Sequence, residues 1–175
     1  MAANIGREQQ TPHKALQTAT EHSPEAVAAM SGALNPLLAD TYALFLKTKN
    51  FHWHVSGPHF RDYHLLFEEQ ANEILAITDL IAERVRMIGG ATLRSIGHIG
   101  KLQRLQDSDE GFVPAGEMLR QLMDDNRALI GSMREARKIC EEHGDFPTAS
   151  LLDEWIEQAE KRAWFLFETS RGAAH

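Results

Sequence analysis

Histidine and acidic side chains recur at regular spacing between residues 50 and 83, in the segment NFHWHVSGPHFRDYHLLFEEQANEILAITDLIAE. His64 and Glu68 are four residues apart. Asp79 and Glu83 have the same spacing, so each pair projects from one face if the segment is helical. His52 lies upstream of both pairs. Because imidazole nitrogens and carboxylate oxygens together suit iron, manganese or zinc, the pattern predicts ligands for a transition metal.

The separation of the two pairs decides how they could act together. Glu68 and Asp79 are eleven residues apart. On a straight helix this is roughly 16 Å, at about 1.5 Å per residue. Metal–ligand bonds are about 2 Å long, so one ion cannot bridge that gap. Either the pairs are two separate half-sites, or the helix meets an antiparallel copy of itself. Since eleven residues make about three turns, both pairs lie on one side, as a two-fold contact requires.

A purely structural reading of the same residues stays open. Histidine and carboxylate side chains at this spacing also occur on solvated helix faces. Arg84 and Arg86 follow Asp79 closely enough to form a surface ion-pair network with it. His54 is two residues from His52 and points elsewhere on a helix, so it is not predicted to be a ligand.

Four long helices are expected to position these residues. Apolar side chains at steps of three and four residues predict helices over about 31–55, 59–88, 114–142 and 147–169. Glycine follows each of the first three helices, and proline also follows the first, since neither residue continues a helix well. The segment 93–105 is predicted to be a connection with one short helix. The inward faces of the second and fourth helices are predicted to include Leu75, Trp164 and Phe167.

No segment shows the alternation of a strand or the turn of a hairpin, so the fold class is all-α. Four long helices with a long connection between the second and third make a ferritin-like four-helix bundle with a crossover. We predict a mobile N-terminal tail over residues 1–30, interrupted by prolines and containing at most a short helix over 24–30. The bundle then covers 31–169, and a short C-terminal tail covers 170–175.

Bulk composition excludes several classes of protein. The 175 residues carry a formal net charge of −7, which argues against nucleic acid as the main partner. No apolar run approaches the ~20 residues of a membrane span, and the first residues lack the apolar core of a secretory signal. The single cysteine, Cys140, allows no intramolecular disulfide, so a reducing cytoplasm is the expected location.

The segment KTKNFHWHVSGPHFRDYHLLFEE, followed by TDLIAERVRMIGG, resembles the Dps family of miniferritins. The similarity runs over most of the chain from Leu34 to Phe167. The Glu-x-x-His motif of larger ferritins is absent, because none of the nine histidines has Glu three residues before it. That absence favours a site between subunits over one inside a single bundle.

The resemblance implies a ferroxidase centre at a two-fold dimer interface. One chain would supply His52, His64 and Glu68, and the other chain Asp79 and Glu83. Glu68 stands where the family often has Asp, which changes the reach of the carboxylate. The substrate would be Fe(II), oxidised preferentially by hydrogen peroxide and stored as ferric mineral, with zinc or manganese as possible occupants of the same ligands.

The resemblance also implies a hollow homododecamer built from two-fold dimers, with iron entering through three-fold pores. Asp145, Asp153 and Glu154 lie at the start of the fourth helix, where such a pore would be lined. A helix start favours carboxylates in any case, so Asp145 has capping as an alternative role. Trp53 beside His52 either fills volume at the interface or traps oxidising equivalents, and radical suppression by a Trp53→Phe variant distinguishes the two.

The family is named for DNA binding, but this chain lacks the basic tail that such binding uses. Residues 1–30 carry Arg7 and Lys14 against three glutamates, a net charge of 2 − 3 = −1. We therefore predict weak or no DNA binding. The alternative functions are a nucleoid-associated protein with little ferroxidase activity, a helical dimer with a salt-bridged seam, and a zinc or manganese protein without redox turnover.

Overall fold

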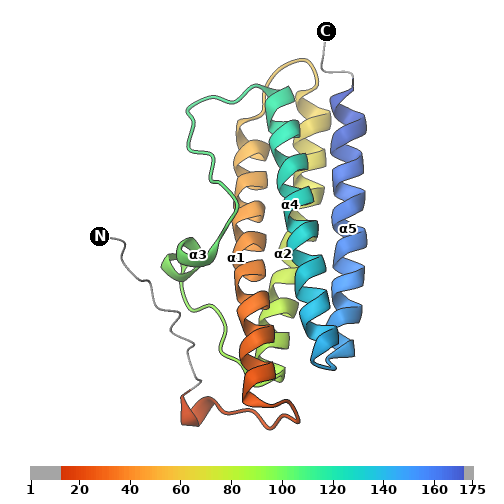
Figure 1. The fold of residues 1–175 in the computed structure, drawn as a ribbon. Coiled ribbons are helices and arrows are strands. Elements are labelled where there is room, and N and C mark those ends of the chain that lie inside the picture. The colour runs from red at the N-terminus through yellow and green to blue at the C-terminus, as the bar shows by residue number, and fades with distance from the viewer. Residues whose placement is uncertain (1–12, 172–175) are drawn as a thin grey trace, which may run out of the picture.

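The computed structural model describes residues 13–171. Every regular element in that range is helical, and the predicted all-α fold is confirmed. The long helices are α1 (Pro24–His54), α2 (Phe60–Met87), α4 (Ala115–Glu142) and α5 (Phe146–Ser170). They lie side by side in one bundle (Figure 1). The crossover from α2 to α4 holds the short helix α3 (Ile96–Leu102), and a single 3-10 turn, Lys14–Leu16, precedes α1.

Helix α1 begins earlier than the sequence pattern predicted. Ser23 is its N-cap, and the Ser23 hydroxyl accepts a hydrogen bond from the backbone N–H of Ala26 at 3.2 Å. Pro24 occupies the first helical turn, where its missing N–H has no cost. Ala26 and Met30 are buried in the core. Residues 24–30 therefore belong to the bundle and not to a tail, while the tail residues 1–12 lie outside the described range.

The core is formed by apolar residues at the predicted helical steps. Helix α1 packs chiefly against α2 and α4, and α4 packs chiefly against α5. The largest fully enclosed apolar side chains include Phe51, Phe67 and Trp155. Gly89 and Gly144 adopt φ values of 99° and 74°, which an L side chain rarely takes, and they end α2 and α4 as glycine stops do.

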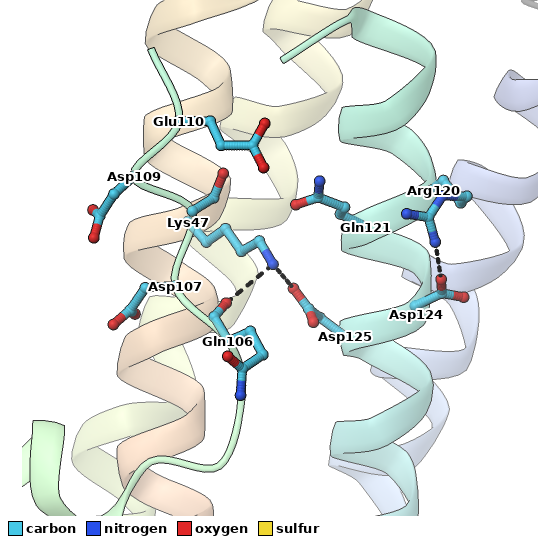
Figure 2. Close-up of a pocket in the computed structure, with 10 residues that line it drawn as sticks. Lys47, Gln106, Asp107, Asp109, Glu110, Arg120, Gln121, Asp124 and Asp125 are labelled. Carbon is cyan, nitrogen blue, oxygen red and sulfur yellow. Dashed lines mark hydrogen bonds and ion pairs between the residues drawn. The ribbon is translucent and has the colours of Figure 1, made fainter. Parts of the chain in front are cut away.

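Two charged residues of α1 hold the crossover against the bundle. Asp40 is 1% exposed, and its carboxylate accepts hydrogen bonds from the guanidinium of Arg104 at 2.8 and 2.6 Å. Lys47 donates to the carbonyl of Gln106 at 3.1 Å and pairs with Asp125 of α4 at 2.8 Å (Figure 2). A buried carboxylate and a buried ammonium thus fix a segment that has little regular structure of its own.

Several large apolar side chains remain on the surface of the single chain. Leu75, Trp164 and Phe167 were predicted to face inward, yet they are among the exposed hydrophobic residues. The prediction failed for them because the apolar stripes of α2 and α5 are wider than the part that the bundle covers. Within residues 13–171, no helix is long and apolar enough to cross a membrane.

Candidate metal site

His52 and His64 come together where the end of α1 meets the start of α2. Their rings stack with centroids 3.8 Å apart and planes 23° from parallel. Nδ1 of His52 lies 2.8 Å from the carbonyl oxygen of His64. Nδ1 of His64 lies 2.8 Å from the carbonyl oxygen of His52. This reciprocal pair crosses the turn between the two helices and fixes both rings.

These contacts also select the tautomer of each ring in its neutral form. A backbone carbonyl can only accept a hydrogen bond, so each Nδ1 must carry the proton. In the neutral form of each imidazole, Nε2 then keeps its lone pair. A histidine that ligates a metal through Nε2 usually donates its other N–H to just such a carbonyl. Both rings are therefore already oriented as Nε2 ligands.

Glu68 lies one helical turn after His64 on α2 and contacts His52. Its Oε2 lies 3.0 Å from Nε2 of His52. The same oxygen accepts a hydrogen bond from the ammonium of Lys49 at 2.5 Å. This bond from Lys49 is the main reason that the pKa of Glu68 falls below its ordinary value. The structure therefore joins an ionised Glu68 to His52, and His52 in turn stacks on His64.

Asp79 and Glu83 are exposed on α2 and do not join that cluster. Helix α2 is continuous from Phe60 to Met87, so the eleven-residue separation between Glu68 and Asp79 still spans roughly 16 Å. Among residues 13–171, no group of three or more His, Cys, Asp or Glu side chains stands ready to hold a metal ion. One chain thus presents two separate half-sets of candidate ligands, the first shared by α1 and α2 and the second on α2 alone.

The face of α2 that bears Asp79 and Glu83 also carries uncovered apolar side chains. Leu65, Leu75 and Leu80 are each more than 40% exposed on this helix. Trp53, at the end of α1, is 58% exposed. Such a run of apolar side chains beside potential ligands is typical of a protein–protein contact.

Two neighbours of the cluster differ in how well the sequence indicated them. His54 is exposed, and its Nδ1 lies 2.8 Å from the carbonyl of Asn50, away from the other histidines, in line with its predicted non-ligand position. Lys49 was missed. The available signal was its position three residues before His52, which places both on one face of α1. Its Nζ also lies 5.8 Å from the ring centroid of Trp53.

The three predicted pore residues have different surroundings. Asp145 is 2% exposed and is the N-cap of α5, where it accepts hydrogen bonds from Thr148 and from Arg84 at 2.9 Å. It therefore takes the capping role that the sequence left open. Asp153 is exposed and accepts a hydrogen bond from Arg137 at 2.6 Å. Glu154 is exposed.

A cavity of about 330 Å³ lies between the crossover and α4, away from the histidine cluster. Five carboxylates line it, but its centre is the Lys47–Asp125 ion pair (Figure 2). Burial raises the pKa of Asp125 above its ordinary value, and the ammonium of Lys47 counteracts this effect. We assign this cluster to anchoring of the crossover.

Comparison with known proteins places the chain among ferritin-like proteins. Residues 31–170 match the family model of the ferritin-like domain. A low-temperature-induced protein of Nostoc sp. is 37% identical over 134 residues, which cover 76% of this chain and 75% of that protein. A DNA protection during starvation protein of Brevibacillus brevis is 34% identical over 133 residues, which cover 76% of this chain and 89% of that protein.

A solved structure agrees with this placement. The crystal structure of a Dps protein from Bacillus brevis superposes with a TM-score of 0.80 at 31% sequence identity. The match covers 84% of this chain and 98% of that one. The resemblance drawn from the histidine-rich segment is thus confirmed by overall sequence and by fold. The chain belongs to the Dps family of ferritin-like miniferritins.

Proposed function

We propose that this protein oxidises Fe(II) at a site completed by two copies of the chain, and stores the product as ferric mineral inside a hollow oligomer. The observation that carries the proposal is the arrangement at the end of α1 and along α2. His52 of α1 with His64 and Glu68 of α2 form one half-site, while Asp79 and Glu83 lie about three turns beyond Glu68 on α2.

A two-fold axis near residues 72–74 would bring the two half-sites together. Glu68 and Asp79 lie at nearly equal distances on either side of Glu73 along α2. If two copies of α2 cross antiparallel about that point, Glu68 of one chain faces Asp79 of the other. An isologous contact of this kind produces the same site twice. The exposed leucines of α2 would be covered by the same contact.

The donor set fits ferrous iron as a substrate. Two imidazole side chains, each able to bind through Nε2, and three carboxylates supply neutral and anionic ligands of the kind that Fe(II) accepts. Zinc and manganese suit the same donors, so they are expected to compete for the site. In the reaction, two ferrous ions each give up one electron, and one hydrogen peroxide, the proposed oxidant, takes both electrons and two protons to become two water molecules. The anionic carboxylates favour the higher charge of the ferric product.

Removal of Fe(II) and peroxide together would prevent the formation of hydroxyl radicals, so the proposed role includes protection against oxidative damage. We place this activity in the cytoplasm, in a dodecamer of two-fold dimers. Iron entry past Asp153 and Glu154 is part of the proposal. Charge-neutral variants of these two residues that take up iron at the wild-type rate would exclude that route.

A complementation experiment tests whether the site is shared between chains. One variant lacks the histidines (His52→Ala/His64→Ala) and the other lacks the acids (Asp79→Ala/Glu83→Ala). Each alone is expected to be inactive. When the two are denatured and refolded together, half of the dimers should be mixed, and one of the two sites in each mixed dimer is intact. About a quarter of the wild-type rate should therefore return.

The control for this experiment refolds each variant by itself, followed by mixing without denaturation. Iron oxidation is measured after anaerobic addition of Fe(II) and then peroxide. If co-refolded material forms mixed oligomers but stays as inactive as its parents, the shared site is wrong. If either variant keeps the wild-type rate by itself, the assigned ligands are wrong.

DNA binding is the alternative function, because relatives carry the name DNA protection during starvation protein. The net charge of −7 opposes contact with phosphates. We expect no stable complex with duplex DNA at submicromolar protein and about 150 mM salt, where several phosphate contacts are needed for retention. A gel shift measures this. A retarded band under those conditions would favour the nucleoid-associated alternative.

A further inference from the structure

Lys49 holds the carboxylate that the proposed function assigns to iron, and the inference drawn here rests on that function. Its Nζ lies 2.5 Å from Oε2 of Glu68, and its side chain is largely buried. Lys49 lies on α1 and Glu68 on α2, so the ion pair bridges the two helices that form the half-site. No residue of the acidic half-site takes part in it.

The oxygen of Glu68 that Lys49 contacts is the same oxygen that lies beside His52. Oε2 of Glu68 lies 3.0 Å from Nε2 of His52, so it is positioned to be a further ligand of an ion bound to His52. An ammonium and a divalent cation repel each other, and both are attracted to this oxygen. A metal that binds Oε2 of Glu68 therefore competes with the ammonium of Lys49 for that oxygen.

The surroundings of Lys49 provide a second place for the displaced ammonium. Its Nζ is already 5.8 Å from the ring centroid of Trp53, within the range of a cation–π contact. Trp53 is mostly exposed in the single chain, so the indole face is accessible to a lysine that turns away from Glu68. A small rotation of a flexible side chain is sufficient for this change.

We propose that Lys49 is a positioning residue that competes with the metal: it holds Glu68 beside His52 in the empty site and is displaced when a divalent ion binds. The lysine thereby lowers the affinity of the site. The site must release its ferric product to the mineral. Re-formation of the ion pair between Glu68 and Lys49 favours that release, because it competes with the bound ion for the carboxylate. A purely structural lysine would act in the opposite direction, and its removal would weaken the site.

The sign of the change in affinity is therefore the test. Zn²⁺, which undergoes no redox reaction, is titrated into the assembled oligomer, and the dissociation constant is measured by calorimetry. Lys49→Met keeps most of the side-chain volume and removes the charge. We expect it to bind Zn²⁺ about tenfold more tightly than the wild type, since the lost hydrogen bond to a charged group had to be broken by the metal.

Two further variants make the result specific. Lys49→Arg keeps the competing charge and should bind Zn²⁺ within about threefold of the wild type. Lys101→Met removes the same charge from an exposed position on α3 and should leave the affinity unchanged. An unchanged or weaker affinity in Lys49→Met would overturn the inference. If Lys49→Met does not assemble, Lys49→Gln is read by the same criterion.

The outcome is separable from the failure of the proposed function. His52→Ala/His64→Ala should abolish the Zn²⁺ binding of the wild type. If the wild type itself binds no Zn²⁺ through these histidines, the proposed site fails together with the role of Lys49. If the histidine variant loses binding while Lys49→Met equals the wild type, only the competition by Lys49 is refuted.

Discussion

His52→Ala/His64→Ala is expected to oxidise Fe(II) at least about a hundredfold more slowly than the wild type. Loss of a group that merely orients a metal ligand typically costs 10- to 100-fold, and this variant loses two ligands themselves. The two rings also orient each other through their Nδ1–carbonyl contacts, so removal of one already loosens the other. The rate of ferric product formation after peroxide addition to anaerobic Fe(II) protein measures the effect.

The matched control is His54→Ala, which removes an exposed histidine two residues from His52 and should keep the wild-type rate. Size-exclusion chromatography must accompany both variants. If the histidines and acids formed only a salt-bridged seam, the double variant would lose dimerisation and keep iron oxidation. That result, or a wild-type rate in an intact oligomer, would refute the metal site.

Asn126→Leu is expected to destabilise the protein by about 3 kcal/mol, because it leaves a buried guanidinium without its acceptor. Arg162 is 1% exposed between α2, α4 and α5, and burial lowers its pKa below the ordinary value. Its Nε donates to Oδ1 of Asn126 at 3.0 Å. Glu73 lies 3.6 Å from one terminal nitrogen, and neither terminal nitrogen has a hydrogen-bond partner in residues 13–171.

Thermal unfolding at a fixed protein concentration measures this cost, since oligomerisation makes Tm concentration-dependent. A loss of about 3 kcal/mol corresponds to a decrease in Tm of roughly 6–12 °C for a chain of this size. The double variant Asn126→Leu/Arg162→Met should recover most of the loss, because apolar groups of similar volume replace the whole polar pair. A single variant as stable as the wild type would show that the guanidinium does not depend on Asn126.

Sequence periodicity predicted the ends of the helices well wherever glycine or proline residues terminate them. Gly57 and Pro58 close α1, and Gly89 closes α2, so their C-terminal ends were predicted within a few residues. The start of α1 was missed because Pro24 was taken as an interruption, whereas the Ser23 cap makes it the first turn. Proline breaks a helix in its interior but fits its beginning, and only the cap distinguishes the two cases.

For the candidate site, spacing alone placed Glu68 on the same helical face as His64. The contact between His52 and His64 depends on how α1 and α2 meet across their turn, and so do the hydrogen bonds from the Nδ1 atoms to the backbone carbonyls. Lys49 was invisible for the same reason, because its partner Glu68 lies on the neighbouring helix. Contacts between helices depend on side-chain directions that local spacing does not fix.

The sequence by itself determined the four long helices, the all-α bundle and the impossibility of one ion reaching both Glu68 and Asp79 on one straight helix. These follow from the fixed rise and period of the α-helix, which are local properties. Only the tertiary structure decided that His52 stacks on His64, that Lys49 forms an ion pair with Glu68, and that Arg162 is buried in the core. Those outcomes depend on packing between helices, where each side chain settles according to partners distant in the sequence.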